Sequence, residues 1–155
     1  MVNKAVLIIC QSVHHGNTMK VAKAIAEVLD AEIKKPSEVN IEEITRYDLI
    51  GFGSGIYNRK HHESLFNLLD KVAIQNSKKA FIFSTSTVLT KTLHKPLKEK
   101  LIRKGFDITG EFCCKGFMSH SFTKYLSGGL NKGRPNEADL KKAKDFAAKL
   151  KNSIT

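Results

Sequence analysis

Three polar segments of this chain could bind a negatively charged ligand, and each directly follows an apolar run. The first, from Ser12 to Thr18, lies between a strand-like run and a stretch whose apolar residues have helical spacing. A helix N-terminus offers unpaired N–H groups and the positive end of the helix dipole, so this turn suits a phosphate. Gly16 would let the backbone approach it closely. The candidate ligands of the turn are Ser12, His14, His15, Gly16, Asn17 and Thr18.

The second segment, residues 53–62, follows the apolar run Tyr47–Phe52 and carries an aromatic residue, Tyr57, followed by Asn58. An aromatic ring offers a stacking face to a flat ligand, and Asn tolerates the left-handed backbone that would turn peptide groups toward the ring edge. The glycines are spaced GxGxG rather than GxGxxG, so the dinucleotide-binding fingerprint is missing. A flexible surface loop is the alternative interpretation of this segment.

The third segment, Ser84–Thr87, follows the apolar run Ala80–Phe83. Its backbone N–H and C=O groups could bond the edge of a heteroaromatic ring, although a plain strand-to-helix connection fits equally well. The first turn has no Lys where a GxxxxGK[ST] loop requires one, which argues against ATP or GTP as the ligand.

Five apolar runs alternate with helical patterns along the chain. This alternation predicts right-handed βαβ crossovers and a doubly wound parallel sheet in a single domain, residues 1–155. The expected strands are Ala5–Cys10, Ala31–Lys34, Tyr47–Phe52, Ala80–Phe83 and Phe106–Phe117. Five helices are expected. The first follows Thr18, the second is short and capped by Asn40, and the third runs from Leu65 to about Asn76. The fourth spans 91–104 with Pro96 in its first turn, and Asn136 caps the last.

The order of these motifs resembles the flavodoxin family over nearly the whole chain. Ser12 followed by Gly16-Asn17-Thr18 resembles its FMN phosphate loop, one residue longer than usual, and Gly53–Tyr57 resembles its segment GSxIY. The resemblance implies a three-layer α/β/α fold, a five-stranded sheet of order 2-1-3-4-5 and FMN as the cofactor. It also implies that Tyr57 stacks on the flavin and that Asn58 replaces a more usual Gly. Beyond the phosphate loop, it assigns flavin contacts to Ser54, Gly55, Ile56, Tyr57, Asn58, Ser84, Thr85, Ser86 and Thr87.

Three functions remain open at this point. The first is a low-potential electron carrier between redox partners, which is what the resemblance implies. The second is a small NAD(P)H-dependent FMN oxidoreductase that reduces a quinone or similar acceptor, so whether the protein is an enzyme is undecided. The third is a flavodoxin-like module without flavin. In the long connection after Met118, Phe122 and Tyr125 are alternative covers for the flavin.

The charge balance bears on the partner. The 155 residues include 26 Lys and Arg against 15 Asp and Glu, a net charge of +11, with most of the excess after residue 90. No nucleic-acid-binding motif accompanies it, so we expect either a solvated surface or one that docks an acidic redox partner. No apolar run is long enough to span a membrane and the start feeds into the first strand, so a cytoplasmic protein is expected. The oligomeric state has no signature in the sequence.

Histidines and cysteines leave further alternatives open. His14-His15 and His61-His62 lie on loops that would flank one site. They could be neutral loop residues, metal ligands, or donors to the FMN phosphate and the reduced flavin, since imidazole titrates near neutral pH. Cys10, Cys113 and Cys114 lie in strand-like runs and are expected to be small buried residues, with a reactive thiol as the alternative.

Overall fold

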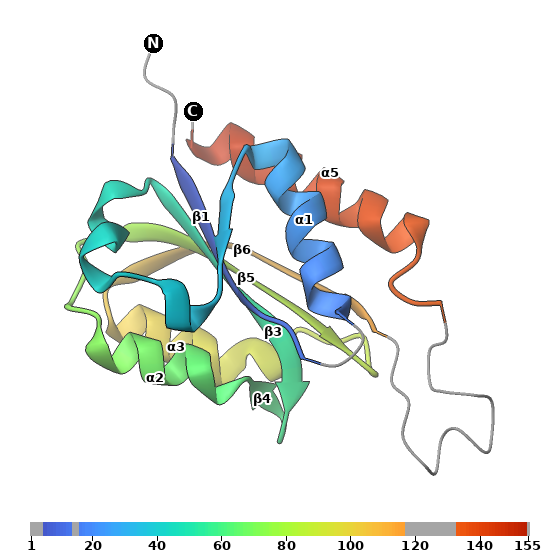
Figure 1. Ribbon diagram of the computed structural model, residues 1–155, viewed down its shortest axis with the longest axis horizontal. Coiled ribbons are helices and arrows are strands. Elements are labelled where there is room, and N and C mark those ends of the chain that lie inside the picture. The colour runs from blue at the N-terminus through green and yellow to red at the C-terminus, as the bar shows by residue number, and fades with distance from the viewer. Residues whose placement is uncertain (1–4, 14–15, 117–132, 155) are drawn as a thin grey trace.

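A twisted, mainly parallel β-sheet with helices on both faces forms the protein, as the computed structural model shows (Figure 1). The structure describes residues 5–13, 16–116 and 133–154. The helices are α1 (Asn17–Leu29), α2 (Glu63–Lys71), α3 (Lys95–Arg103) and α5 (Glu137–Ile154), with 3₁₀ turns at Pro36–Glu38, Ile41–Arg46 and Thr92–His94. Helices α1 and α5 cover one face of the sheet and α2 and α3 the other, which confirms the predicted three layers.

Strand pairing also follows the prediction. The strands are β1 (Val6–Gln11), β2 (Glu32–Lys34), β3 (Leu49–Tyr57), β4 (Lys60–His61), β5 (Lys78–Ser86) and β6 (Phe106–Lys115). The parallel order β2-β1-β3-β5-β6 is the predicted order 2-1-3-4-5, because the two-residue strand β4 was not expected. Strand β4 pairs antiparallel with the end of β3 and closes a hairpin, the β3–β4 hairpin.

The apolar core has two halves, one on each face of the sheet. In β1, Ile8 and Cys10 pack toward α1 and α5, whereas Leu7 and Ile9 pack with the cluster under α2 and α3. All four side chains are fully buried. An uninterrupted apolar run of this kind needs cover on both faces, which is why it predicted a parallel sheet with helices on each side.

Local residues set where two of the helical segments begin, whereas packing in the core sets where α2 ends. As predicted, the Asn40 side chain accepts a bond from the N–H of Glu42, and that of Asn136 accepts one from Asp139. Helix α2 ends at Lys71 rather than near Asn76, because the backbone of Val72 turns extended and its side chain enters the core. Helix α3 begins only at Lys95, after the 3₁₀ turn Thr92–His94. Of these helices, none is long and apolar enough to cross a membrane.

Two strands run further than their composition predicted. The loop expected from Gly53 and the turn expected from Ser84 both begin inside strands, because Ser54 pairs with Ser84 and Gly55 with Thr85 in the β3–β5 ladder. The prediction of loops at these positions was therefore wrong. Hydroxyl and glycine residues do not favour strands by themselves, but the ladder continues wherever a neighbouring strand supplies partners.

Aromatic rings occupy the glycine positions of β3. A Cβ atom on Gly51 would lie 2.2 Å from Cζ of Phe81, and one on Gly53 would lie 2.1 Å from Cζ of Phe83. Both rings are fully buried on the α1 and α5 face. Gly51 and Gly53, two glycines of the GxGxG pattern, therefore make room for two aromatic rings of the neighbouring strand β5.

This packing predicts that Gly53→Ala destabilises the fold by about 1–3 kcal/mol, the usual cost of overpacking a core. Urea unfolding measures it. In the double variant Gly53→Ala/Phe83→Leu the shorter side chain frees the space, so the double variant should lose clearly less than the sum of the two single changes. Additive losses would mean that the ring does not occupy the glycine position.

Candidate functional site

The three polar segments meet at one edge of the sheet. In the ladders Gln11 pairs with Ser54 and Ser54 pairs with Ser84, so the polar segments that follow β1, β3 and β5 start at nearly the same level of the sheet. We call this the strand-end edge; in Figure 1 it lies where α1 begins and the β3–β4 hairpin ends. Open α/β sheets bind their ligands at the carboxyl ends of their strands.

The turn between β1 and α1 places a left-handed glycine directly before the helix N-terminus. Gly16, with φ of 66°, precedes α1 in the left-handed region, and a Cβ atom there would meet nothing within 4 Å. Gly16 has no side chain with which to cap this 13-residue helix, and the first turn of the helix contains no acidic residue. The Ser12 hydroxyl accepts a bond from the N–H of Met19 at 3.3 Å, one residue beyond Thr18. This arrangement suits an anion, because no acidic side chain of the first turn stands at the positive end of the helix dipole.

Thr18 is placed differently from the sequence-based expectation. Its hydroxyl lies 2.7 Å from that of Thr85 on β5, and the two residues are 2% and 4% exposed. The pair ties the first turn of α1 to the end of β5. His14 and His15 lie outside the described residues.

The β3–β4 hairpin is shaped by two left-handed residues and one serine. Asn58 and Arg59 have φ of 50° and 65°, which gives the tight turn that joins β3 to β4. The buried Ser54 donates to the carbonyl of Gly55 at 2.6 Å and accepts a bond from the N–H of His62 at 2.9 Å. The start and the return of the hairpin are thus tied to each other.

The aromatic ring of this hairpin folds back along β3. The Tyr57 hydroxyl oxygen lies 3.0 Å from where a Cβ atom of Gly55 would be, and its ring meets that of His62 edge to face at 5.2 Å. Burial, with a smaller effect from Cys10, raises the pKa of Tyr57 above its ordinary value. The half-buried ring lies at the strand-end edge, where the sequence predicted an aromatic platform.

The hydroxyl groups at the end of β5 are used inside the protein. Ser84 bonds the imidazole of His94 at 2.6 Å, Thr85 bonds Thr18, and Ser86 donates to the carbonyl of Val88. A ligand at this edge would therefore meet the backbone of the segment rather than these hydroxyls.

The two histidines of the hairpin bond within the protein, which favours the alternative of neutral residues over that of donors to an anionic ligand. His61 is 1% exposed and points to the carbonyl of Phe83, and burial lowers its pKa to about 3, so it is neutral at physiological pH. His62 caps α2, because its Nδ1 atom accepts a bond from the N–H of Ser64 at 3.1 Å. Among the described residues, no group of three His, Cys, Asp or Glu could hold a metal ion.

Sequence reasoning missed the residues that support this edge. His94 and Glu111 had no assigned role, because they lie on different elements and come together only in the fold. The cysteines match the expectation in part. All three are free, Cys10 and Cys114 are buried with pKa values raised to about 12 by burial, and Cys113 is half-buried.

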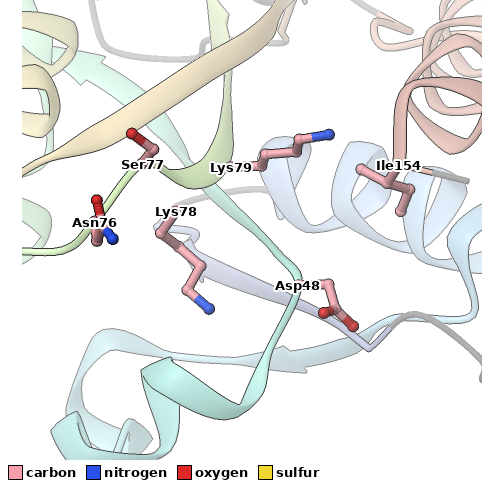
Figure 2. A pocket seen from close by; sticks show the side chains of 6 residues that line it. All are labelled: Asp48, Asn76, Ser77, Lys78, Lys79 and Ile154. Atoms are coloured by element: carbon pink, nitrogen blue, oxygen red, sulfur yellow. The ribbon is translucent and has the colours of Figure 1, made fainter.

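A hollow of about 270 Å³ lies at the opposite edge of the sheet (Figure 2). Its two ammonium groups already bond carbonyls, since Lys78 donates to Tyr47 and Lys79 to Ser153. The lining residues are Asp48, Asn76, Ser77, Lys78, Lys79 and Ile154. The hollow therefore offers less to a ligand than the strand-end edge does.

Comparison with known proteins identifies the family. A family model described as a flavodoxin domain matches residues 7–115. This chain belongs to the flavodoxin-domain family. An uncharacterised protein of Methanocaldococcus jannaschii is 55% identical over 146 residues, which cover 93% of this chain and 96% of that protein.

Solved flavodoxins share the fold at low sequence identity. A flavodoxin from the domain Archaea superposes with a TM-score of 0.72 at 15% identity, covering 97% of this chain and 98% of its own. Flavodoxin 2 from Bacillus cereus gives a TM-score of 0.72 at 18% identity, covering 96% and 99%. The fold implied by the sequence resemblance is thus confirmed.

Proposed function

We propose that the protein binds one FMN non-covalently at the strand-end edge and carries electrons between redox partner proteins. The observation that carries the proposal is the N-terminus of α1, which follows the left-handed Gly16 and has no acidic residue in its first turn, at the same edge as the ring of Tyr57. Bound FMN would supply electron transfer at its flat ring system. Membership of the flavodoxin-domain family supports this cofactor.

The roles of the residues follow from their placement. We assign the phosphate to the backbone N–H groups at the start of α1 and stacking to Tyr57, with the positive-φ turn at Asn58 and the backbone of Ser84–Thr87 at the ring edge. Thr18 and Ser54 act indirectly by holding these segments. The assigned set is the predicted one: Ser12, His14, His15, Gly16, Asn17, Thr18, Ser54, Gly55, Ile56, Tyr57, Asn58, Ser84, Thr85, Ser86 and Thr87.

The phosphate assignment predicts that Asn17→Asp lowers FMN affinity by at least about tenfold, or about 1.4 kcal/mol, without weakening riboflavin binding. A carboxylate at this position, where Oδ1 of Asn17 is buried, would repel a phosphate at the helix N-terminus, so FMN binding should fall, and urea unfolding checks that the variant is folded. Quenching of flavin fluorescence measures both affinities. Asn67→Asp, on the exposed surface of α2, makes the same charge change away from the edge and should leave both unchanged. Equal losses for FMN and riboflavin would contradict the phosphate site.

The carrier role is tested by the absorbance spectrum of FMN-loaded protein mixed with NADPH alone. A carrier needs a partner to deliver electrons, so the flavin bands should persist with NADPH and disappear only with a chemical reductant. Rapid bleaching by NADPH would instead identify a stand-alone oxidoreductase. Protein that stays colourless after incubation with excess FMN would identify a binding module.

A partner with an acidic surface fits the net charge of +11 and the exposed Arg59 and Lys60 beside Tyr57. Reoxidation of the reduced, FMN-loaded protein by anionic ferricyanide should therefore slow when ionic strength rises from about 0.01 to about 1 M, as the Debye length falls from about 30 to about 3 Å. With cationic hexaammineruthenium(III) the rate should rise instead. Stopped-flow absorbance follows both reactions. The same salt response for both reagents would argue against an acidic partner.

A further inference from the structure

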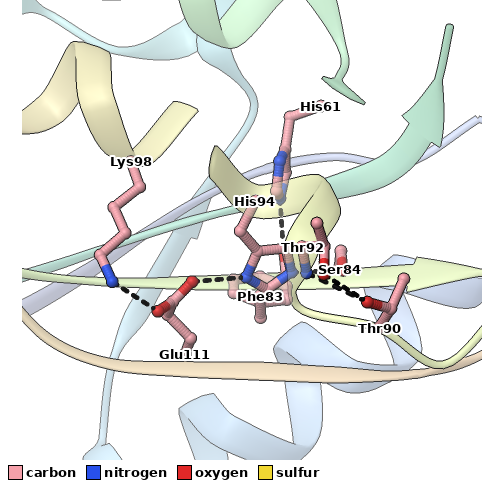
Figure 3. A network of polar contacts seen from close by, with 8 residues as sticks. All are labelled: His61, Phe83, Ser84, Thr90, Thr92, His94, Lys98 and Glu111. Carbon is pink, nitrogen blue, oxygen red and sulfur yellow. Dashed lines mark hydrogen bonds and ion pairs between the residues drawn. The ribbon is translucent and has the colours of Figure 1, made fainter. Parts of the chain in front are cut away.

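Two buried imidazoles lie between the β3–β4 hairpin and the end of β5 (Figure 3). His61 of β4 and His94, at the end of the 3₁₀ turn before α3, are 1% and 0% exposed, and their ring centroids are 5.0 Å apart. His61 Nε2 lies 3.0 Å from the carbonyl oxygen of Phe83, and His94 Nε2 lies 2.6 Å from the Ser84 hydroxyl. Two consecutive residues of β5 are thus held by two histidines.

The partners fix where the protons lie. A carbonyl can only accept, so His61 carries its proton on Nε2 and its Nδ1 is a bare lone pair with no hydrogen-bond partner in the described part of the chain. Glu111 Oε1 lies 3.1 Å from His94 Nδ1, and the other oxygen of Glu111 accepts a bond from Lys98 at 2.9 Å. His94 therefore donates from Nδ1 and accepts from Ser84 at Nε2.

A serine, a histidine and a carboxylate in this order have the geometry of an activated nucleophile. Burial excludes that use, because Ser84 is 1% exposed and no substrate carbonyl could reach its oxygen. The Ser84–His94–Glu111 chain therefore holds the protein in place instead of reacting.

We propose that His61 and His94 are positioning residues that latch the β3–β4 hairpin against the end of β5, and that the latch holds only while the imidazole of His61 is neutral. His94, backed by Glu111 and Lys98, fixes Ser84. His61 fixes the hairpin to Phe83, one residue earlier. The turn at Asn58 and the ring of Tyr57 are thereby set against the segment Ser84–Thr87. The latch is a property of the chain alone, and only its effect on FMN rests on the proposed function.

Protonation of either ring is opposed by its burial. A proton on Nδ1 of His61 would be a buried donor without an acceptor, facing His94. The charged groups that act on His94 are Glu111 of β6, which favours its protonation, and Lys91 and Lys98 beside and on α3, which oppose it. Burial outweighs Glu111 and keeps the pKa of His94 below its ordinary value, as burial does more strongly for His61.

The sign of the pH effect follows. An opened hairpin exposes His61 to water, where its pKa returns to about 6.5 and it takes up a proton that the closed form excludes. The opening equilibrium therefore rises by up to about tenfold for each pH unit below about 6.5 and is unchanged above it.

Hydrogen–deuterium exchange of the full chain without FMN tests the latch. Between about pH 7.5 and about pH 5, protection of a peptide spanning residues 55–63, corrected for the intrinsic exchange rate, should fall by at least about tenfold. His61→Gln keeps a donor for Phe83 but does not titrate, so its protection should be independent of pH. His61→Leu loses the donor and should be poorly protected at both pH values. His62→Gln, which removes the neighbouring imidazole, should keep the pH dependence, and α5 should be unaffected in every variant.

A second measurement does not depend on how the variants fold. Long-range ¹⁵N correlations of the wild-type protein should show the Nε2–H tautomer for His61 and the Nδ1–H tautomer for His94, with neither ring titrating near pH 6.5. Titration of His61 near 6.5, or hairpin protection independent of pH in the wild type, would overturn the latch whether or not FMN binds. If FMN binds as proposed, its affinity should fall with pH in the wild type in parallel with hairpin protection, and His61→Gln should abolish that dependence.

Discussion

The end of β5 is held from both faces of the sheet, and the arrangement of the strand-end edge depends on this. On the α1 face the hydroxyl of Thr85 bonds that of Thr18, and on the α3 face the hydroxyl of Ser84 bonds His94. Side chains of consecutive strand residues point to opposite faces, so two adjacent hydroxyls reach two different layers. The first turn of α1 and the 3₁₀ turn before α3 are thereby joined through short bonds to a single strand.

The helix N-termini at the edge differ in the charged groups that stand beside them. Helices α1 and α5, which cover the same face of the sheet, show this difference. Asp139 lies in the first turn of α5, where it pairs with Arg134 and accepts a bond from the N–H of Asn136. The first turn of α1 contains no acidic residue. Asp139 therefore compensates the dipole of α5 within the protein, whereas no acidic residue of the first turn compensates the dipole of α1.

Polar residues at the edge support the backbone more often than they face outward. Four hydroxyl side chains at the edge are buried, and each of them bonds within the protein: Ser54, Ser84, Thr85 and Thr18. A buried hydroxyl is costly unless it is bonded, so each of these residues marks a place where two elements must meet in one geometry. Such an edge presents backbone groups to a ligand from a frame that its own side chains fix.

The sequence alone determined the layers, the number of long strands and the position of the edge, because these follow from local patterns. An apolar run such as Val6 to Cys10 needs cover on both faces, and the spacing around Val21 and Ile25 can only serve a helix with one buried side. The caps at Asn40 and Asn136 were equally readable, since a cap involves residues within one turn. The strand order came from family resemblance, because local patterns do not encode which strands become neighbours.

Only the tertiary structure decided where the strands end and what the polar side chains do. Ser54 and Gly55 extend β3 because β5 lies alongside, and Gly51 and Gly53 are needed because the rings of Phe81 and Phe83 lie over them. His61 looks like its neighbour His62 in the sequence, yet one is a buried neutral imidazole and the other a helix cap. Burial and partners from distant elements set the charge of a titratable side chain, and these exist only once the chain has folded.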